Sequence, residues 1–112
     1  MTYSLNTIIL EPLSKNKAKN AVILCHGYGG DGKDISILAN YWRTYLPDTI
    51  FVCPDAPEKC AASPTGFQWF DLVDEAPDQV LAKSLVAENK LNKLIDEVKE
   101  KNNLKASEII IG

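Results

Sequence analysis

Three segments of the chain are apolar at almost every position, without the alternation of a half-exposed strand. They are residues 21–25, 49–53 and 108–111. Short continuous apolar runs of this kind are typical of strands buried on both faces of a parallel sheet. A further short strand is expected over residues 6–10. The pattern therefore predicts a mostly parallel sheet as the centre of the fold.

Two other segments are apolar at the spacing of a helix. Residues 34–46 have apolar side chains three and four positions apart, with Asp34 near the start, where a carboxylate suits the helix dipole, and Pro47 at the end. A longer helix is marked by Leu81, Leu85, Leu91, Leu94, Ile95 and Val98, and it is acidic near its start at Asp74, Glu75 and Asp78. The order of strand, helix and strand over residues 21–53 predicts a βαβ unit.

Residues 54–78 show neither period. This segment contains four prolines, beginning with Pro54, which is expected to stop the preceding strand. It is longer than the usual connection in a compact domain, and long ordered loops are often functional. It also holds a dense aromatic cluster, formed by Phe67, Trp69 and Phe70.

Composition narrows the class of protein. The chain has 112 residues, of which 46% are hydrophobic and 24% charged, as in one soluble globular domain or part of one. The net charge of −3 and the absence of a basic stripe make nucleic acid and anionic membranes poor partners. There is neither a signal-peptide pattern nor an apolar run of the ~20 residues that span a membrane. A cytoplasmic location is therefore expected.

The three cysteines, Cys25, Cys53 and Cys60, have no spacing typical of a metal site, and we expect them to be reduced. Cys25 precedes His26, which raises the question of a thiol nucleophile. Adjacent strand residues point to opposite faces, so the two side chains are poorly placed to share a proton.

The segment between the first apolar run and the first helix has glycine at positions 27, 29, 30 and 32. A glycine-rich turn after a strand can present its amide groups to an anion. Gly27, Gly29 and Gly32 fit the G-x-G-x-x-G pattern of dinucleotide-binding domains, with Asp55 near the expected ribose-binding position. However, Asp31 and Asp34 would repel a pyrophosphate at the helix N-terminus.

Two other motifs fit the same glycines. Residues 27–33 match the phosphate loop G-x-x-x-x-G-K, but Asp34 stands where that motif needs a serine or threonine for magnesium. A plain structural turn is also possible. The remaining motif is H-G-x-G over residues 26–29, which in α/β-hydrolases supplies one backbone donor of an oxyanion hole.

Three further segments follow the H-G-x-G motif in order: Pro-Asp-Ala-Pro at 54–57, Gly-Phe-Gln-Trp-Phe-Asp at 66–71 and Ile-Ile-Ile-Gly at 109–112. With this ordered combination, the chain resembles the phospholipase/carboxylesterase family of α/β-hydrolases, which includes acyl-protein thioesterases. The resemblance extends from about Leu5 to Gly112. It implies a three-layer α/β sandwich, of which residues 1–112 form the N-terminal half of a single domain.

The resemblance also implies roles for individual residues. The backbone amide of Tyr28 would be the oxyanion donor, and Phe67, Trp69 and Phe70 would lie beside the acyl pocket. His26, Gly27 and Gly29 would shape the loop, while Gly112 matches the first glycine of the nucleophile elbow G-x-S-x-G. The catalytic serine, acid and histidine of the family come later in the chain order, so no triad member is assigned within these residues.

The function expected by resemblance is hydrolysis of carboxylic esters or thioesters through an acyl-serine, without metal or cofactor. The chain is expected to be a truncated part of a longer hydrolase that is inactive alone and pairs with the remainder of its own domain. Its exposed strand edges would then favour poor folding or association. A dinucleotide-binding domain and a noncatalytic fragment or interaction module remain alternatives.

Overall fold

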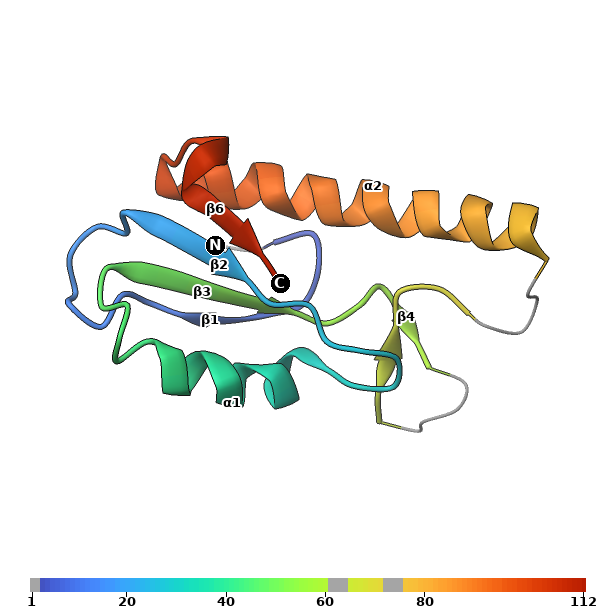
Figure 1. Ribbon diagram of the computed structural model, residues 1–112, viewed down its shortest axis with the longest axis horizontal. Coiled ribbons are helices and arrows are strands. Elements are labelled where there is room, and N and C mark those ends of the chain that lie inside the picture. Colours follow the sequence, from blue (N-terminus) through green and yellow to red (C-terminus); the bar gives the residue numbers. More distant parts are fainter. Residues whose placement is uncertain (1–2, 61–64, 72–75) are drawn as a thin grey trace.

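A four-stranded sheet forms the middle layer of the molecule, with one helix on each side (Figure 1). The computed structural model describes residues 3–60, 65–71 and 76–112. The elements of the sheet and its helices are β1 (Thr7–Leu10), β2 (Asn20–Ile23), α1 (Gly32–Trp42), β3 (Thr49–Pro54), α2 (Pro77–Asn102) and β6 (Ile109–Ile111), with a 3₁₀ turn at Ala106–Glu108 before β6. The predicted three-layer α/β architecture is confirmed.

The strands of the sheet lie in the order β1-β3-β2-β6. β2 runs parallel to both β3 and β6, while β1 pairs antiparallel with β3 at one edge. The predicted βαβ unit is therefore present. β3 continues through Pro54, one residue further than predicted, because Pro54 lies opposite Thr7 and the next amide, of Asp55, donates to the carbonyl oxygen of Asn6 over 2.7 Å.

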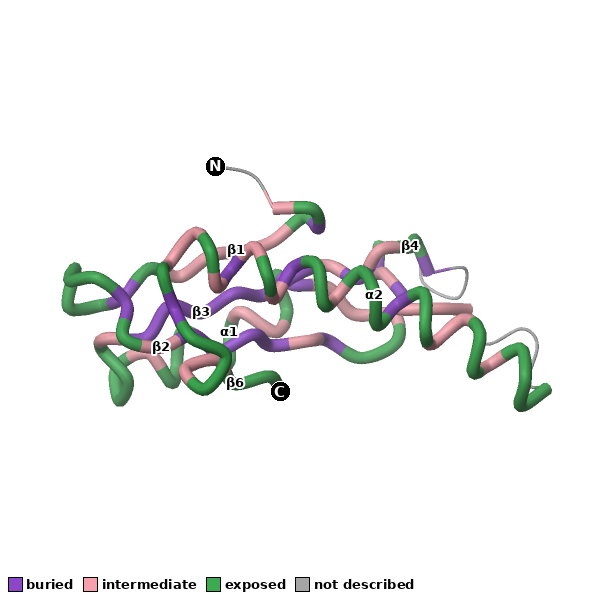
Figure 2. Tube along the Cα trace, turned by 90° about the horizontal axis from the view of Figure 1, so that it is seen from above, coloured by how far each residue is buried: buried purple, intermediate pink, exposed green. Residues whose placement is uncertain are grey.

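The two faces of the central strands belong to two separate cores. Successive residues point to opposite faces, so Ala21 and Ile23 of β2 face α2, whereas Val22 and Leu24 face α1. β3 alternates in the same way, with Val52 on the α2 side and Phe51 on the α1 side. The α2-side core also contains Ile50, Leu94, Val98 and Leu104, and the α1-side core Cys53 and Ala39. Burial on both faces explains why these strands are apolar at almost every position (Figure 2).

The helix boundaries differ from those predicted. α1 begins two residues earlier than expected, because the side chain of Asp31 accepts a hydrogen bond from the amide of Asp34 over 2.7 Å and is the N-cap. It ends at Trp42, four residues before the predicted end at Leu46. Ala39 is its one fully buried apolar residue among those expected to face the core, whereas Leu38, Trp42 and Leu46 are exposed.

α2 also differs from a uniformly buried amphipathic helix. Its C-terminal half packs on the sheet through Leu94 and Val98, but Leu81 and Leu85 near its start are exposed, where the helix extends past the sheet (Figure 1). Of the acidic residues expected near its start, Asp78 lies in the first turn, while Asp74 and Glu75 lie outside the described residues. Among the described helices, none has the length and apolar character that a membrane crossing requires.

The predicted irregular segment 54–78 contains a small antiparallel hairpin of β4 (Glu58–Lys59) and β5 (Phe67–Gln68). The sequence pattern missed it because two-residue strands carry no detectable period. The third predicted core strand is also different from expectation. β6 is an edge strand, with Ile110 and Ile111 60% and 49% exposed, because β2 covers only one of its sides.

Candidate active site

The glycine loop connects the C-terminal end of β2 with the start of α1, and two of its glycines meet a specific backbone requirement. Gly29 has φ of 83°, a left-handed conformation that other residues adopt at a cost. A side chain at Gly32 would overlap the carbonyl oxygen of Cys53, because α1 starts directly against the end of β3. By contrast, a Cβ atom at Gly27 would meet nothing within 4 Å. Only part of the glycine pattern is therefore fixed by local packing.

The amide groups at the start of α1 are occupied by the chain's own carboxylates. Asp55 Oδ1 accepts a hydrogen bond from the amide of Gly32 over 2.7 Å, and Asp31 caps the amide of Asp34. A dinucleotide or a nucleotide phosphate would need this helix N-terminus. Asp55, considered as a ribose-binding acid, instead anchors the glycine loop to the end of β3. The geometry therefore argues against both nucleotide-binding motifs.

The β4-β5 hairpin holds the middle of the glycine loop. The amide of Gly29 donates to the carbonyl oxygen of Phe67 over 2.9 Å, and the amide of Phe67 donates to the carbonyl oxygen of Gly30 over 2.8 Å. The side chain of Tyr28 adds a contact, a hydrogen bond with Cys60, and this bond raises the pKa of the Tyr28 hydroxyl group. The loop is thus attached to a hairpin that lies more than 25 residues away in sequence.

His26 is 5% exposed, and both of its ring nitrogens have partners. The amide of Ala56 donates to Nε2 over 2.9 Å, and Nδ1 lies 2.7 Å from the carbonyl oxygen of Gly27. The ring stacks on Trp69 with 5.7 Å between centroids, and the indole Nε1 donates to the carbonyl oxygen of His26 over 3.0 Å. These contacts leave no ring nitrogen to serve as a catalytic base.

Tyr28, predicted by resemblance to supply the oxyanion donor, has an amide with no hydrogen-bond partner in the part of the chain that the structure describes. The carbonyl oxygen of Gly27 belongs to the same peptide unit. It accepts a hydrogen bond from the amide of Gly30 over 3.1 Å and also contacts Nδ1 of His26. A fixed peptide unit with a free donor is the geometry that an oxyanion hole needs.

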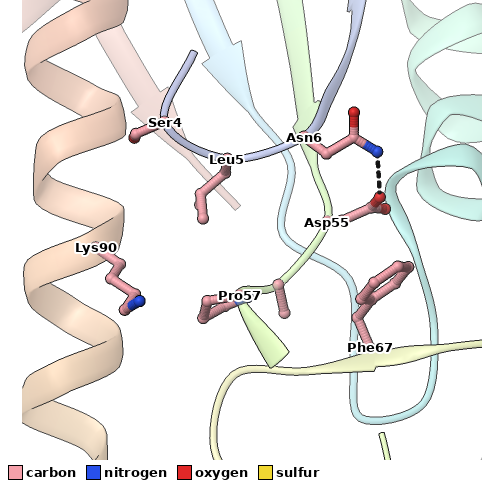
Figure 3. Close-up of a pocket in the computed structure, with 8 residues that line it drawn as sticks. Ser4, Leu5, Asn6, Asp55, Pro57, Phe67 and Lys90 are labelled. Carbon is pink, nitrogen blue, oxygen red and sulfur yellow. Dashed lines mark hydrogen bonds between the residues drawn. The ribbon is translucent and has the colours of Figure 1, made fainter. Parts of the chain in front are cut away.

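The aromatic residues predicted to lie beside an acyl pocket have different environments. Phe67 lines a cavity of about 260 Å³ between the N-terminal segment, the end of β3 and α2. Figure 3 shows Lys90 reaching from α2 toward this cavity and Asn6 bonded to Asp55 at its other side. Trp69 lies against His26 and the α2-side core, and Phe70 is half-buried. The next residue, Asp71, forms an ion pair with Lys83 over 2.6 Å.

Gly112 and Cys25 lie side by side at the same end of the sheet as the loop. The amide of Gly112 donates to the carbonyl oxygen of Ile23 over 2.9 Å. In turn, the amide of Cys25 donates to the carbonyl oxygen of Gly112 over 2.8 Å. Gly112 thus extends the pairing of β6 with β2 toward the glycine loop. Burial raises the pKa of the Cys25 thiol, which does not favour a thiolate nucleophile. Cys25, Cys53 and Cys60 are all free thiols.

A mixed, mostly parallel sheet between helices, with an H-G-x-G loop at the carboxyl end of a strand, is the arrangement expected of the N-terminal part of an α/β-hydrolase fold. The family comparison agrees, since the model of the phospholipase/carboxylesterase family matches residues 8–112. The chain belongs to this family. Within the described residues, no group of three histidine, cysteine, aspartate or glutamate side chains is placed to hold a metal ion.

Two solved structures are similar to this chain. Esterase PE8 is 35% identical with a TM-score of 0.86, and the match covers 96% of this chain and 50% of that protein. A carboxylesterase from Mesorhizobium loti is 18% identical with a TM-score of 0.69, covering 97% and 48% respectively, and it supports the fold. The chain therefore spans about half the length of these structures.

Sequence reasoning missed three contributors to the loop. Asp31 could have been recognised as the N-cap, since an aspartate immediately before a helix is a known signal. Asp55 and Ala56 stood out in the sequence as part of the Pro-Asp-Ala-Pro segment, but their contacts with the loop could not be foreseen because they form only when β3 pairs with β2. Their contacts with Gly32 and His26 are made across 23 and 30 residues of sequence.

Proposed function

We propose that this chain supplies the glycine-loop half of the oxyanion hole of a carboxylesterase or phospholipase-like hydrolase. The observation that carries the proposal is the peptide unit between Gly27 and Tyr28. Its carbonyl oxygen is held within the loop, while the amide of Tyr28 has no partner among the described residues. A preorganised backbone donor of this kind stabilises the negative charge that develops on a carbonyl oxygen during acyl transfer.

The substrate class is a carboxylic ester or thioester with an apolar acyl chain. The reaction would proceed through attack by an activated serine, an acyl-serine intermediate and its hydrolysis, chemistry that requires neither a metal nor a cofactor. Phe67, whose backbone is hydrogen-bonded to the loop, would offer apolar surface to the acyl chain, together with Phe70 further along the same segment. Membership of the phospholipase/carboxylesterase family and the similarity to esterase PE8 support this class.

The residues that complete the reaction are proposed to lie outside residues 1–112. His26 has both ring nitrogens engaged, and it is the only histidine in the sequence. The serine would follow Gly112 in an elbow at the end of β6, and the amide after it would be the second oxyanion donor. The remainder of the hydrolase domain would then be the partner of the open side of β6.

The proposal is tested by comparing a chain of residues 1–112 with the full-length protein in hydrolysis of p-nitrophenyl esters and of an acyl thioester. The full-length protein is expected to show turnover that a serine-reactive fluorophosphonate abolishes. Residues 1–112 are expected to show none. Inhibitor-sensitive turnover by residues 1–112, or no hydrolysis of either substrate by the full-length protein, would contradict the proposal.

A further inference from the structure

His26 is connected to the proposed oxyanion donor through one peptide unit. The imidazole Nδ1 lies 2.7 Å from the carbonyl oxygen of Gly27. That oxygen and the amide N–H of Tyr28 belong to the same planar unit and point in opposite directions, because the peptide bond is trans. Any group that holds the Gly27 carbonyl therefore also sets the direction of the Tyr28 N–H bond.

The contact with Ala56 decides which ring nitrogen carries the proton. A backbone N–H can only donate, so Nε2 of His26 must accept the hydrogen bond from Ala56. A neutral imidazole with an accepting Nε2 carries its hydrogen on Nδ1. Nδ1–H then donates to the carbonyl oxygen of Gly27. A chain of two hydrogen bonds thus runs from the end of β3 through the imidazole to the donor's peptide unit.

Trp69 fixes the ring that carries this chain of bonds. Its indole stacks on the imidazole with an angle of 30° between the planes, and its Nε1–H holds the carbonyl oxygen of His26, one peptide unit before that of Gly27. Trp69 also packs against the α2-side core, which includes Leu94. The orientation of the loop is therefore tied to the rigid centre of the fold.

We propose that His26 is a positioning residue, which as the Nδ1–H tautomer aims the amide of Tyr28 at the reacting carbonyl, and that Trp69 holds the imidazole in place. The effect on turnover rests on the proposed function. The geometry of the loop does not, and it can be measured whether or not the protein hydrolyses esters.

The first measurement is nitrogen NMR of the histidine ring in the full-length wild-type protein. The expected result is a protonated Nδ1 and an unprotonated Nε2. The opposite tautomer would overturn the proposal directly. Because this experiment needs no substitution, it remains decisive if a variant fails to fold.

The second measurement separates positioning from general support of the loop with two variants. In H26N, the amide nitrogen can take the place of Nδ1 and keep the donor to Gly27. In H26Q, the amide oxygen can reach the place of Nε2 and keep the acceptor for Ala56 but not that donor. Residual dipolar couplings of the Tyr28 N–H bond are expected to be close to wild type in H26N and changed in H26Q. Equal couplings in both variants would contradict the proposal.

The third measurement is kinetic. In the full-length protein, H26Q is expected to lower kcat by about 100-fold with little change in KM, as misplacement of an oxyanion donor does, and H26N to restore most of the loss. W69F keeps the stacking and loses the N–H, so a roughly fivefold loss in kcat is expected. W42F, on the exposed outer part of α1, is the matched control and should match wild type.

Failure of this proposal and failure of the proposed function give different results. If the NMR data agree but no ester or thioester is hydrolysed, the loop geometry holds and the function is wrong. If hydrolysis is present but H26N and H26Q lose the same activity, or KM alone changes, the function holds and the positioning role of His26 is wrong.

Discussion

The amide of Gly32 donates to Asp55 Oδ1 over 2.7 Å, and this bond joins the start of α1 to the residue that follows β3. The first amide of the helix is therefore bound by a carboxylate of the chain itself. The same contact brings the backbone of Gly32 so close to β3 that a side chain would overlap Cys53. The loop that presents Tyr28 is therefore braced at its far end by backbone packing and a charge-assisted hydrogen bond.

Replacement of Gly32 by alanine is expected to destabilise the fold by ~3 kcal/mol, because the added methyl group meets backbone rather than a movable side chain. G27A is the matched control, since open space surrounds that position, and its free energy of unfolding should stay within about 0.5 kcal/mol of wild type. Urea unfolding of both variants measures the difference. Equal stability of the two would show that α1 does not pack against β3 at Gly32.

Removal of the Asp55 carboxylate is expected to leave the buried amide of Gly32 without an acceptor. D55A should lower the free energy of unfolding by about 2 kcal/mol, the cost of an unsatisfied buried donor. D55N keeps an acceptor oxygen and should lose less. N6A removes only the exposed bond of Asn6 to Asp55 and is the control. If D55A and N6A were equally stable, Asp55 would not anchor the loop.

Stability at high pH is expected to depend on Cys53. Burial raises the pKa of this thiol from 9.0 to about 11 in the folded protein. The folded state therefore binds the proton more tightly than the unfolded state, so the stabilising effect is complete below pH 9 and is lost as the pH rises to about 11. The free energy of unfolding of wild type should fall more steeply over this range than that of C53A. Parallel curves for the two proteins would contradict this expectation.

The open side of β6 is expected to make residues 1–112 self-associate. An edge strand with exposed apolar residues is a template for pairing with another chain. I110K places a charge on this strand and should reduce the apparent mass in analytical ultracentrifugation. I37K is the matched control, because Ile37 is similarly exposed, at 68% against 60%, but lies on α1. An equal effect of both substitutions would mean that general hydrophobicity, rather than the edge of β6, drives association.

The sequence predicted the layers of the fold better than the residues at which helices and strands begin and end. The continuous apolar runs of β2 and β3 identified strands buried on both faces, and both strands are present with α1 between them. The ends of α1 were less well predicted: the N-cap signal of Asp31 was not used, and the helix stops at Trp42 although the apolar spacing continues to Leu46. The hairpin of β4 and β5 could not be predicted, since its two-residue strands carry no period and two of its backbone hydrogen bonds are made with the distant glycine loop.

By itself, the sequence determined the hydrophobic pattern, the glycine loop after the first buried strand and the H-G-x-G motif that indicated an α/β-hydrolase. These features are local, since they depend on spacing along the chain. Only the tertiary structure decided how the loop is held. Asp55, Ala56, Phe67 and Trp69 reach His26 and the glycines from distant segments. Hydrogen bonds between such segments exist only after the strands pair in one register, and for this reason no local pattern encodes them.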